Sequence, residues 1–152
     1  MMRVILPDDL RNRILREAAA AHPGECCGLV EGLRGQEGYR VLALHPARNL
    51  ATARDRFEID PQDHFAAHRA ARANGHALIG CYHSHPHGPA QPSAADQAGA
   101  EDDNFLWLIA GQEGLNAFVP VQDGFGRLDL AKEDGVEEDG AEELAGRGPP
   151  PL

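Results

Sequence analysis

The chain has 152 residues and a formal net charge of −10. Its length suits one domain, and 42% hydrophobic with 25% charged residues is typical of an ordinary globular protein. The longest apolar run covers residues 105–110, far short of the roughly 20 residues that cross a bilayer, so we expect no membrane-spanning segment.

Most of the negative charge lies at the carboxyl end. From Asp129 onward eight acids oppose Lys132 and Arg147, a net charge of −6, which leaves −4 for residues 1–128. The body of the chain carries no basic stripe of the kind that neutralises phosphates. Nucleic acid is therefore not an expected partner.

The cysteines and the amino end indicate a reducing compartment. Three cysteines are present, Cys26 and Cys27 are adjacent, and no C-x-x-C spacing occurs. The apolar residues 4–6 are followed at once by Pro7 and two aspartates, which is too polar for a signal peptide. We expect reduced thiols in a cytoplasmic protein.

The first half of the chain predicts a helix, a hairpin and a second helix. Residues 7–21 form a helix that Asp8 can cap, with Leu10, Ile14 and Ala18 along one face. Further expected elements are strands at 26–33 and 39–44 joined as an antiparallel hairpin, a short strand at 57–59, and a helix at 61–73 ended by Asn74-Gly75.

The second half predicts a buried strand at 76–82, a histidine- and proline-rich loop at 83–92, and a short helix opened by Ser93. Three strands separated by glycine-containing turns follow at 105–110, 115–121 and 125–130. We therefore expect one α/β (α+β) domain over residues 1–130, with a mixed sheet flanked by helices. Residues 131–152, acidic and rich in glycine and proline, are expected to be a disordered tail.

The loop after the buried strand holds candidate metal ligands. His83 and His85 lie two positions apart, so their side chains share a face if the strand continues past Tyr82. Asp96 follows eleven positions after His85, beyond a proline-rich loop. Two histidines and a carboxylate suit a catalytic Zn²⁺ site, in which the fourth position stays open for water.

Simpler interpretations exist for single members of this region. Ser93 and Asp96 form an S-x-x-D pattern typical of a helix capping box, which is compatible with a carboxylate that also faces a metal. His87 is expected to face solvent. Cys81 is an alternative metal ligand that stays open. The H-x-E and P-C-x-x-C spacings of zinc-dependent nucleotide deaminases do not occur.

The run His-Ser-His-Pro at 83–86, followed by Ser93 and Asp96, resembles the JAMM motif of the MPN-domain metallopeptidases. Residues 23–29, residues 48–49 and residues 57–61 also resemble the short stand-alone bacterial and archaeal members. The resemblance covers about residues 5–122. It implies a curved mixed sheet flanked by helices, similar to the cytidine-deaminase fold.

The resemblance also implies roles for five residues. His83, His85 and Asp96 would hold one Zn²⁺ per chain. Glu25 would be the general acid and base, and Ser93 would help to stabilise the tetrahedral intermediate. Spacing alone does not single out Glu25, which lies 58 positions before His83.

The function that this resemblance implies is that of a zinc-dependent peptidase or isopeptidase. Its partner would be a ubiquitin-like or sulfur-carrier protein with a Gly-Gly C-terminus, cleaved at that end. Two alternatives stay open: a non-catalytic MPN-like scaffold that docks a partner, and an amidase acting on cell-wall or other small peptides. Metal content separates the scaffold from the enzymes, and substrate profiling separates the amidase.

Overall fold

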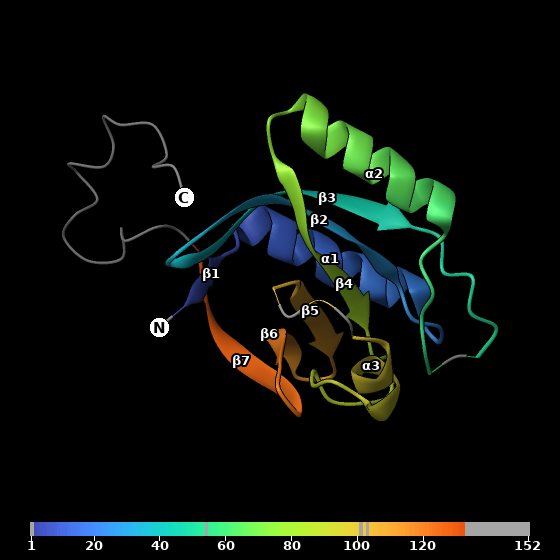
Figure 1. Cartoon of the computed structure of the whole chain (residues 1–152). Helices are drawn as coiled ribbons and strands as arrows, with labels where there is room; N and C mark the ends of the chain where they lie inside the picture. Colours follow the sequence, from blue (N-terminus) through green and yellow to red (C-terminus); the bar gives the residue numbers. More distant parts are fainter. Residues whose placement is uncertain (1, 54, 101, 103, 133–152) are drawn as a thin grey trace.

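The computed structural model describes residues 2–53, 55–100, 102 and 104–132. In this part of the chain seven strands and three helices form one mixed α+β domain, which confirms the predicted fold class (Figure 1). The predicted tail at 131–152 lies, from residue 133 on, outside the described residues. None of the described helices is long and apolar enough to cross a membrane.

The elements follow one another in the order β1, α1, β2, β3, α2, β4, α3, β5, β6 and β7. Their bounds are β1 Arg3–Ile5, α1 Asp8–Ala21, β2 Cys27–Gly35, β3 Gly38–Ala47, α2 Pro61–Ala73, β4 Ala77–Ser84, α3 Ala94–Gly99, β5 Leu106–Gly111, β6 Gly114–Val121 and β7 Gly124–Ala131.

The strands form one closed sheet in the order β1-β3-β2-β4-β5-β6-β7, closed by the pairing of β1 with β7. Strands β2–β3, β2–β4, β5–β6 and β6–β7 pair antiparallel, whereas β4–β5 and both pairings of β1 are parallel. The sheet is therefore mixed, as expected. Its closure was not predicted, and the likeness to the cytidine-deaminase fold stays a prediction.

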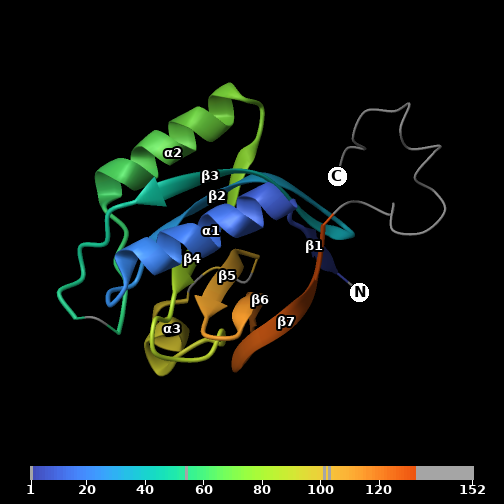
Figure 2. The same ribbon diagram turned by 180° about the vertical axis from the view of Figure 1, so that it is seen from behind.

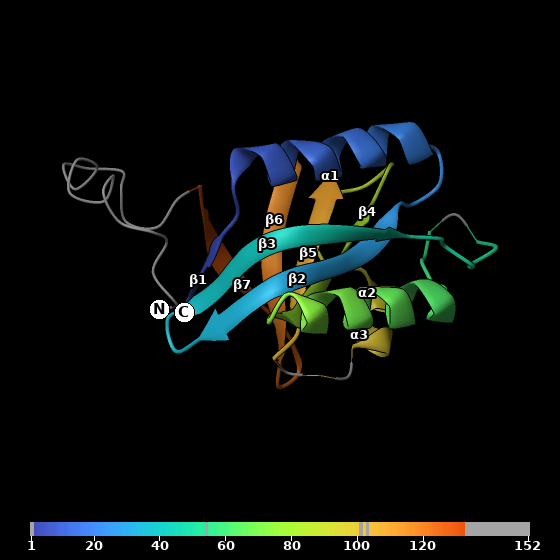
Figure 3. The ribbon, with the colours of Figure 1, turned by 90° about the horizontal axis from the view of Figure 1, so that it is seen from above.

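Helices α1 and α2 lie on opposite sides of the strands (Figures 2 and 3). Because side chains alternate along a strand, Tyr82 belongs to the apolar cluster that includes Ile14 of α1, and Cys81 belongs to the cluster that includes Ala67 of α2. His83 follows in the same alternation as Cys81. The end of β4 therefore carries its histidine toward the α2 side of the sheet.

Several predicted elements are confirmed closely. Helix α2 has the expected bounds, begins with Pro61, and is capped by Asp60, whose Oδ1 accepts a hydrogen bond from the Gln62 N–H. The hairpin of β2 and β3 is antiparallel. Ser93 caps α3 in a reciprocal capping box with Asp96.

Two predictions were wrong and one strand was missed. Strand β1 was missed, since three residues become a strand only through pairing with β3 and β7. Asp8 does not cap α1: the helix boundary is Pro7, whose carbonyl accepts the Leu10 and Arg11 N–H groups, and no side chain caps it. Residues 57–59 form only an isolated bridge between Asn49 and Ile59.

Candidate functional site

The two histidines of the predicted metal site meet at the end of β4. His83 is the penultimate residue of the strand and His85 follows it, and their Nε2 atoms lie 3.1 Å apart. The His83 ring is fully buried, stacked on Phe57 at 4.2 Å and edge-on to Trp107 at 5.6 Å between ring centroids. Both imidazoles therefore point toward one place, and aromatic packing holds the His83 ring there.

Asp96 completes a triangle of donor atoms. Its Oδ2 lies 3.1 Å from the Nε2 atom of His83 and 3.1 Å from that of His85, so all three sides of the triangle measure 3.1 Å. Asp96 comes from the first turn of α3, where the capping box with Ser93 fixes it: Oδ2 accepts the Ser93 N–H at 2.9 Å, and the Ser93 Oγ accepts the Asp96 N–H at 3.1 Å. The structural role and the inward-facing carboxylate thus coexist.

Hydrogen bonding indicates the charge that these three donor atoms must share. The Nδ1 atom of His85 lies 3.0 Å from the Pro89 carbonyl, which can only accept, so Nδ1 carries a proton. In neutral His85 the Nε2 atom is then a lone pair that faces the Asp96 oxygen, another acceptor. A positive charge shared by these atoms, a proton or a metal ion, is needed to balance them.

Glu25 is brought to the same place by strand pairing. It precedes β2, in which Cys27 pairs with His83. Buried Ser84 fastens the two strands because its Oγ accepts the Cys26 N–H at 2.9 Å and its N–H donates to the Cys26 carbonyl at 3.2 Å. As a result, potential ligand atoms of Glu25, His83 and His85 all lie within 4.8 Å of one another.

Glu25 is almost completely buried. The side chain is 6% exposed, and its Oε1 has no hydrogen-bond partner among the described residues. Burial raises the pKa of Glu25 to about 7; the positive charge of His85 works against this, while Asp96 and Asp55 add to it. A carboxyl group with such a pKa is able to take up and release a proton near neutral pH.

Burial and hydrogen bonding set the charge of the remaining members. Burial lowers the pKa of His83, which favours the neutral imidazole that binds metals. Burial would raise the pKa of Asp96, but hydrogen bonds with His83 and His85 outweigh it and hold that pKa well below its ordinary value. The donor set is therefore one carboxylate with at least one neutral imidazole.

The site opens into a cleft of about 370 Å³. The cleft is lined by Glu25, Asp55, His85, Pro86, His87, Gly88, Pro89, Gln91, Pro92 and Ser93. A second groove of about 740 Å³, with Asp96, Phe57 and Trp107 in its wall, lies against the same site. The predicted site residues thus line two hollows: Glu25, His85 and Ser93 line the first, and Asp96 lines the second.

The loop that carries the cleft is anchored at its middle. The Ala90 N–H donates to both carboxylate oxygens of Glu113, at 3.1 and 3.0 Å, and the Ala90 carbonyl accepts from Asn116 at 3.0 Å. Gly111 lets the loop approach, because a Cβ there would lie 2.3 Å from the Ala90 nitrogen. The Pro89 carbonyl that orients His85 is therefore held in place.

Comparison with known protein families identifies the chain. Residues 7–121 match the family model described as prokaryotic homologues of the JAB domain. The chain belongs to this JAB family. The resemblance to the JAMM and MPN-domain metallopeptidases that its motifs indicated is thereby confirmed.

Relatives of this JAB-family chain include named proteins from archaea and bacteria. It is 34% identical to a desampylase of Haloferax volcanii, covering 86% of this chain and 97% of the relative. It is 36% identical to a probable TtuB-protein conjugate cleaving protease of Thermus thermophilus, covering 75% and 71%. Protein DSY2949 of Desulfitobacterium hafniense has a similar solved structure, with a TM-score of 0.78, 29% identity, and coverage of 88% of this chain and 95% of that one.

Two neighbours of the motif lie outside the donor set of the JAB-family chain. Cys81 is buried in the apolar core, and the candidate metal cluster found among the described residues contains no cysteine. His87 is exposed and lines the cleft, with its ring edge-on to that of His22 at 4.9 Å between ring centroids. The prediction that His87 faces solvent is confirmed.

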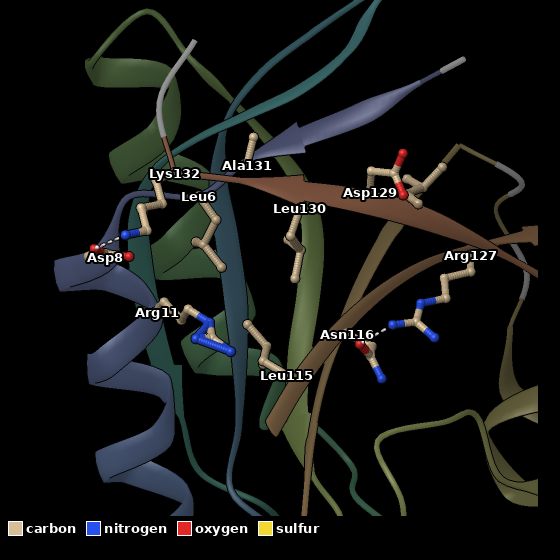
Figure 4. Close-up of a pocket in the computed structure, with 11 residues that line it drawn as sticks. Leu6, Asp8, Arg11, Leu115, Asn116, Arg127, Asp129, Leu130, Ala131 and Lys132 are labelled. Atoms are coloured by element: carbon tan, nitrogen blue, oxygen red, sulfur yellow. Dashed lines mark hydrogen bonds and ion pairs between the residues drawn. The ribbon is translucent and has the colours of Figure 1, made fainter. Parts of the chain in front are cut away.

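A separate hollow of about 380 Å³ lies at the amino end of α1 beside β7 (Figure 4). Arg11, Asn116, Arg127 and Lys132 are among its lining residues. None of the five predicted site residues reaches it, so the chemistry that the motif implies is confined to the end of β4.

Sequence reasoning missed the residues that orient the site. The contacts of Ser84 with Cys26 and of Phe57 with His83 join segments far apart in the chain, whereas Pro89 contacts His85 within one loop. Ser84 and Pro89 stand within the motif region, which was the only signal available for them. Phe57 had only its place in the resembling segment 57–61.

Proposed function

We propose that this chain is a zinc-dependent peptidase or isopeptidase. It hydrolyses the amide bond at the C-terminus of a ubiquitin-like or sulfur-carrier protein. The observation that carries the proposal is the equal-sided triangle of His83, His85 and Asp96 donor atoms with the buried Glu25 carboxylate beside it. Membership of the JAB family supports the same reading.

His83, His85 and Asp96 would hold the zinc ion. Zinc bonds of about 2.0–2.2 Å in a tetrahedral site separate neighbouring ligand atoms by about 3.3–3.5 Å, close to the 3.1 Å between the atoms here. When bound, zinc supplies Lewis acidity that activates water for attack and polarises the carbonyl group. The Pro89 carbonyl and the Ser93 N–H keep His85 and Asp96 oriented for this task.

Glu25 would move the proton. Its Oε1, which has no hydrogen-bond partner in the described part of the chain, accepts a proton from the attacking water and then delivers it to the departing amine nitrogen. The same carboxyl group thus acts first as base and then as acid. A pKa of about 7 suits both directions near neutral pH.

Ser93 would stabilise the oxyanion of the tetrahedral intermediate. Its Oγ already accepts the Asp96 N–H, which leaves the hydroxyl proton free to donate into the cleft that Ser93 lines. This hydrogen bond strengthens only as negative charge develops on the carbonyl oxygen, and it therefore favours the transition state over the bound substrate.

The substrate class follows from the named relatives. The Haloferax relative is named a desampylase, and the Thermus relative is named a probable TtuB-protein conjugate cleaving protease. For this chain we propose a carrier ending in Gly-Gly, because two residues without side chains can pass a narrow cleft in extended form.

The test uses purified full-length protein and a Gly-Gly-terminated carrier with a C-terminal extension. Cleavage should stop on treatment with a chelator, return with zinc, and be lost in Glu25→Gln. The exposed Glu37→Gln, the same chemical change elsewhere, should cleave like the unmodified protein. Equal cleavage with and without the chelator, or by Glu25→Gln, would contradict the mechanism; binding of the carrier without any cleavage would favour the scaffold.

A further inference from the structure

The Asn49 side chain uses its full hydrogen-bonding capacity. Its Oδ1 accepts the N–H groups of Ala51 and Glu58, both at 2.9 Å. Its Nδ2 donates to the carbonyl of Glu25 at 3.1 Å and to that of Arg56 at 3.3 Å. An amide has two donors and one oxygen with two lone pairs, so all four are occupied.

These bonds join the segment 49–59 to the site from two directions. The segment is closed at its base by the bridge between Asn49 and Ile59 and by the Leu50 N–H donating to the Glu58 carbonyl at 2.8 Å. Near its end Phe57 stacks on the buried ring of His83 at 4.2 Å. Asn49 therefore links the backbone of Glu25 to Arg56 and Glu58, the two residues that flank Phe57.

Closing the turn that follows Asn49 does not require all four hydrogen bonds of its side chain. The two bonds of the Asn49 Oδ1 within the segment are enough to hold a turn of this kind. The bond of Nδ2 to the Glu25 carbonyl spans 24 positions of sequence and adds nothing to that turn. It does restrain Glu25, which is 6% exposed and whose Oε1 has no hydrogen-bond partner among the described residues.

We propose that Asn49 is a positioning residue for the reaction. Its amide fixes the Glu25 backbone and the Phe57 ring relative to each other, and so keeps the Glu25 carboxylate beside the two imidazoles. This inference rests on the proposed function. Misplacement of a reacting group by about 1 Å can cost about 10²-fold in rate, which gives such a restraint a measurable effect.

The test compares Asn49→Asp and Asn49→Ala with a matched control. Asn49→Asp keeps the size and the Oδ1 acceptor but loses the donor to Glu25, whereas Asn49→Ala loses all four bonds. The control is Asn74→Ala, because the Asn74 side chain also makes a long-range hydrogen bond, at 2.9 Å to Glu31, away from the site. Cleavage of the extended Gly-Gly carrier is measured per mole of folded, zinc-loaded protein.

We expect kcat to fall about 10- to 100-fold in whichever Asn49 variant folds, with KM within about threefold and one zinc per chain retained. Asn74→Ala should lose thermal stability but keep its kcat. A kcat within twofold of the unmodified protein would overturn the inference, since a purely structural role lowers Tm alone. A loss confined to KM would overturn it as well, because that result assigns Asn49 to substrate binding.

Amide hydrogen exchange separates failure of this inference from failure of the proposed function. If the unmodified protein cleaves no carrier, the proposed function fails, and exchange then decides whether Asn49 restrains Glu25. The Cys26 amide, next to Glu25 and bonded to the Ser84 Oγ, should exchange at least about tenfold faster in Asn49→Asp and at an unchanged rate in Asn74→Ala. Unchanged exchange in Asn49→Asp would refute the restraint itself.

Discussion

Replacing Glu31 by glutamine should destabilise the protein without touching the site. Glu31 is 1% exposed, at a bulge of β2, and is surrounded by donors from other elements. Its Oε1 lies 2.7 Å from the Nε2 of His45; its Oε2 lies 2.6 Å from the Nδ1 of His76 and accepts from Asn74 at 2.9 Å. This buried carboxylate thus ties β2 to β3 and to the end of α2.

The size of the effect follows from the hydrogen bonds lost. A hydrogen bond to a charged group contributes about 1.5–3 kcal/mol, and a glutamine would keep one acceptor oxygen while turning an NH₂ group toward a donor. We expect the free energy of unfolding to fall by about 2–4 kcal/mol. The fall is smaller than the summed hydrogen bonds because a neutral amide costs less to bury than a carboxylate. For a domain of this size the melting temperature should fall by about 5–15 °C.

The pKa of Glu31 determines how the effect of Glu31→Gln on stability changes with pH. Burial would raise the pKa of Glu31, but hydrogen bonds from Asn74, His45 and His76 outweigh it and hold the pKa below its ordinary value. The stabilisation is therefore complete above the unfolded-state pKa of about 4.3 and is lost as pH falls through the lower folded-state value. The difference between Glu31→Gln and the unmodified protein should be full at pH 7 and shrink below about pH 4.

Urea unfolding at pH 7 and at decreasing pH measures this difference. The control is Glu37→Gln, an exposed glutamate in the turn of the same hairpin, which should change the unfolding free energy by less than about 0.5 kcal/mol. An effect of Glu31→Gln no larger than that of the control, or one that grows as the pH falls below 4, would refute the reasoning.

Three further predictions concern the site. Ser93→Ala should lower kcat about 10²- to 10³-fold with zinc content unchanged, measured by carrier cleavage and metal analysis; loss of zinc instead would count against an oxyanion role. Asp96→Asn should lose most bound zinc while circular dichroism shows α3 retained, because the amide oxygen still accepts the Ser93 N–H; full zinc content would remove Asp96 from the ligand set. Gly111→Ala should weaken zinc binding about 10- to 100-fold in chelator competition, since its Cβ displaces Ala90 and with it the carbonyl that orients His85; unchanged affinity would show that this support is dispensable.

Local patterns predicted the elements whose signals are local. Helix α2 follows from Pro61 at its start and Asn74-Gly75 at its end, and the buried face of α1 follows from Ile14 with its neighbours one turn away. Strand β1 could not be found in this way. Its partners begin at Gly38 and Asp129, 35 and 126 positions after Arg3, so only the closed sheet makes it a strand.

The site residues also divide into those with a local sequence signal and those without one. His83, His85 and Asp96 lie within 14 consecutive residues and carry a recognisable spacing, so their meeting could be expected from sequence. Glu25 was selected by resemblance, because the hydrogen bond of Cys26 with Ser84 that brings it near spans 58 positions. Contacts such as that of Asn49 with Glu25 depend on the final packing and leave no pattern in the sequence.

Zinc titration of metal-free protein, with cleavage of the extended Gly-Gly carrier as the readout, tests the central claim most directly. Product formation should be absent without metal, rise linearly with added zinc and level off at one ion per chain, while Glu25→Gln takes up the same single ion and releases no product. Cleavage by the metal-free protein, or undiminished cleavage by zinc-loaded Glu25→Gln, would contradict the account.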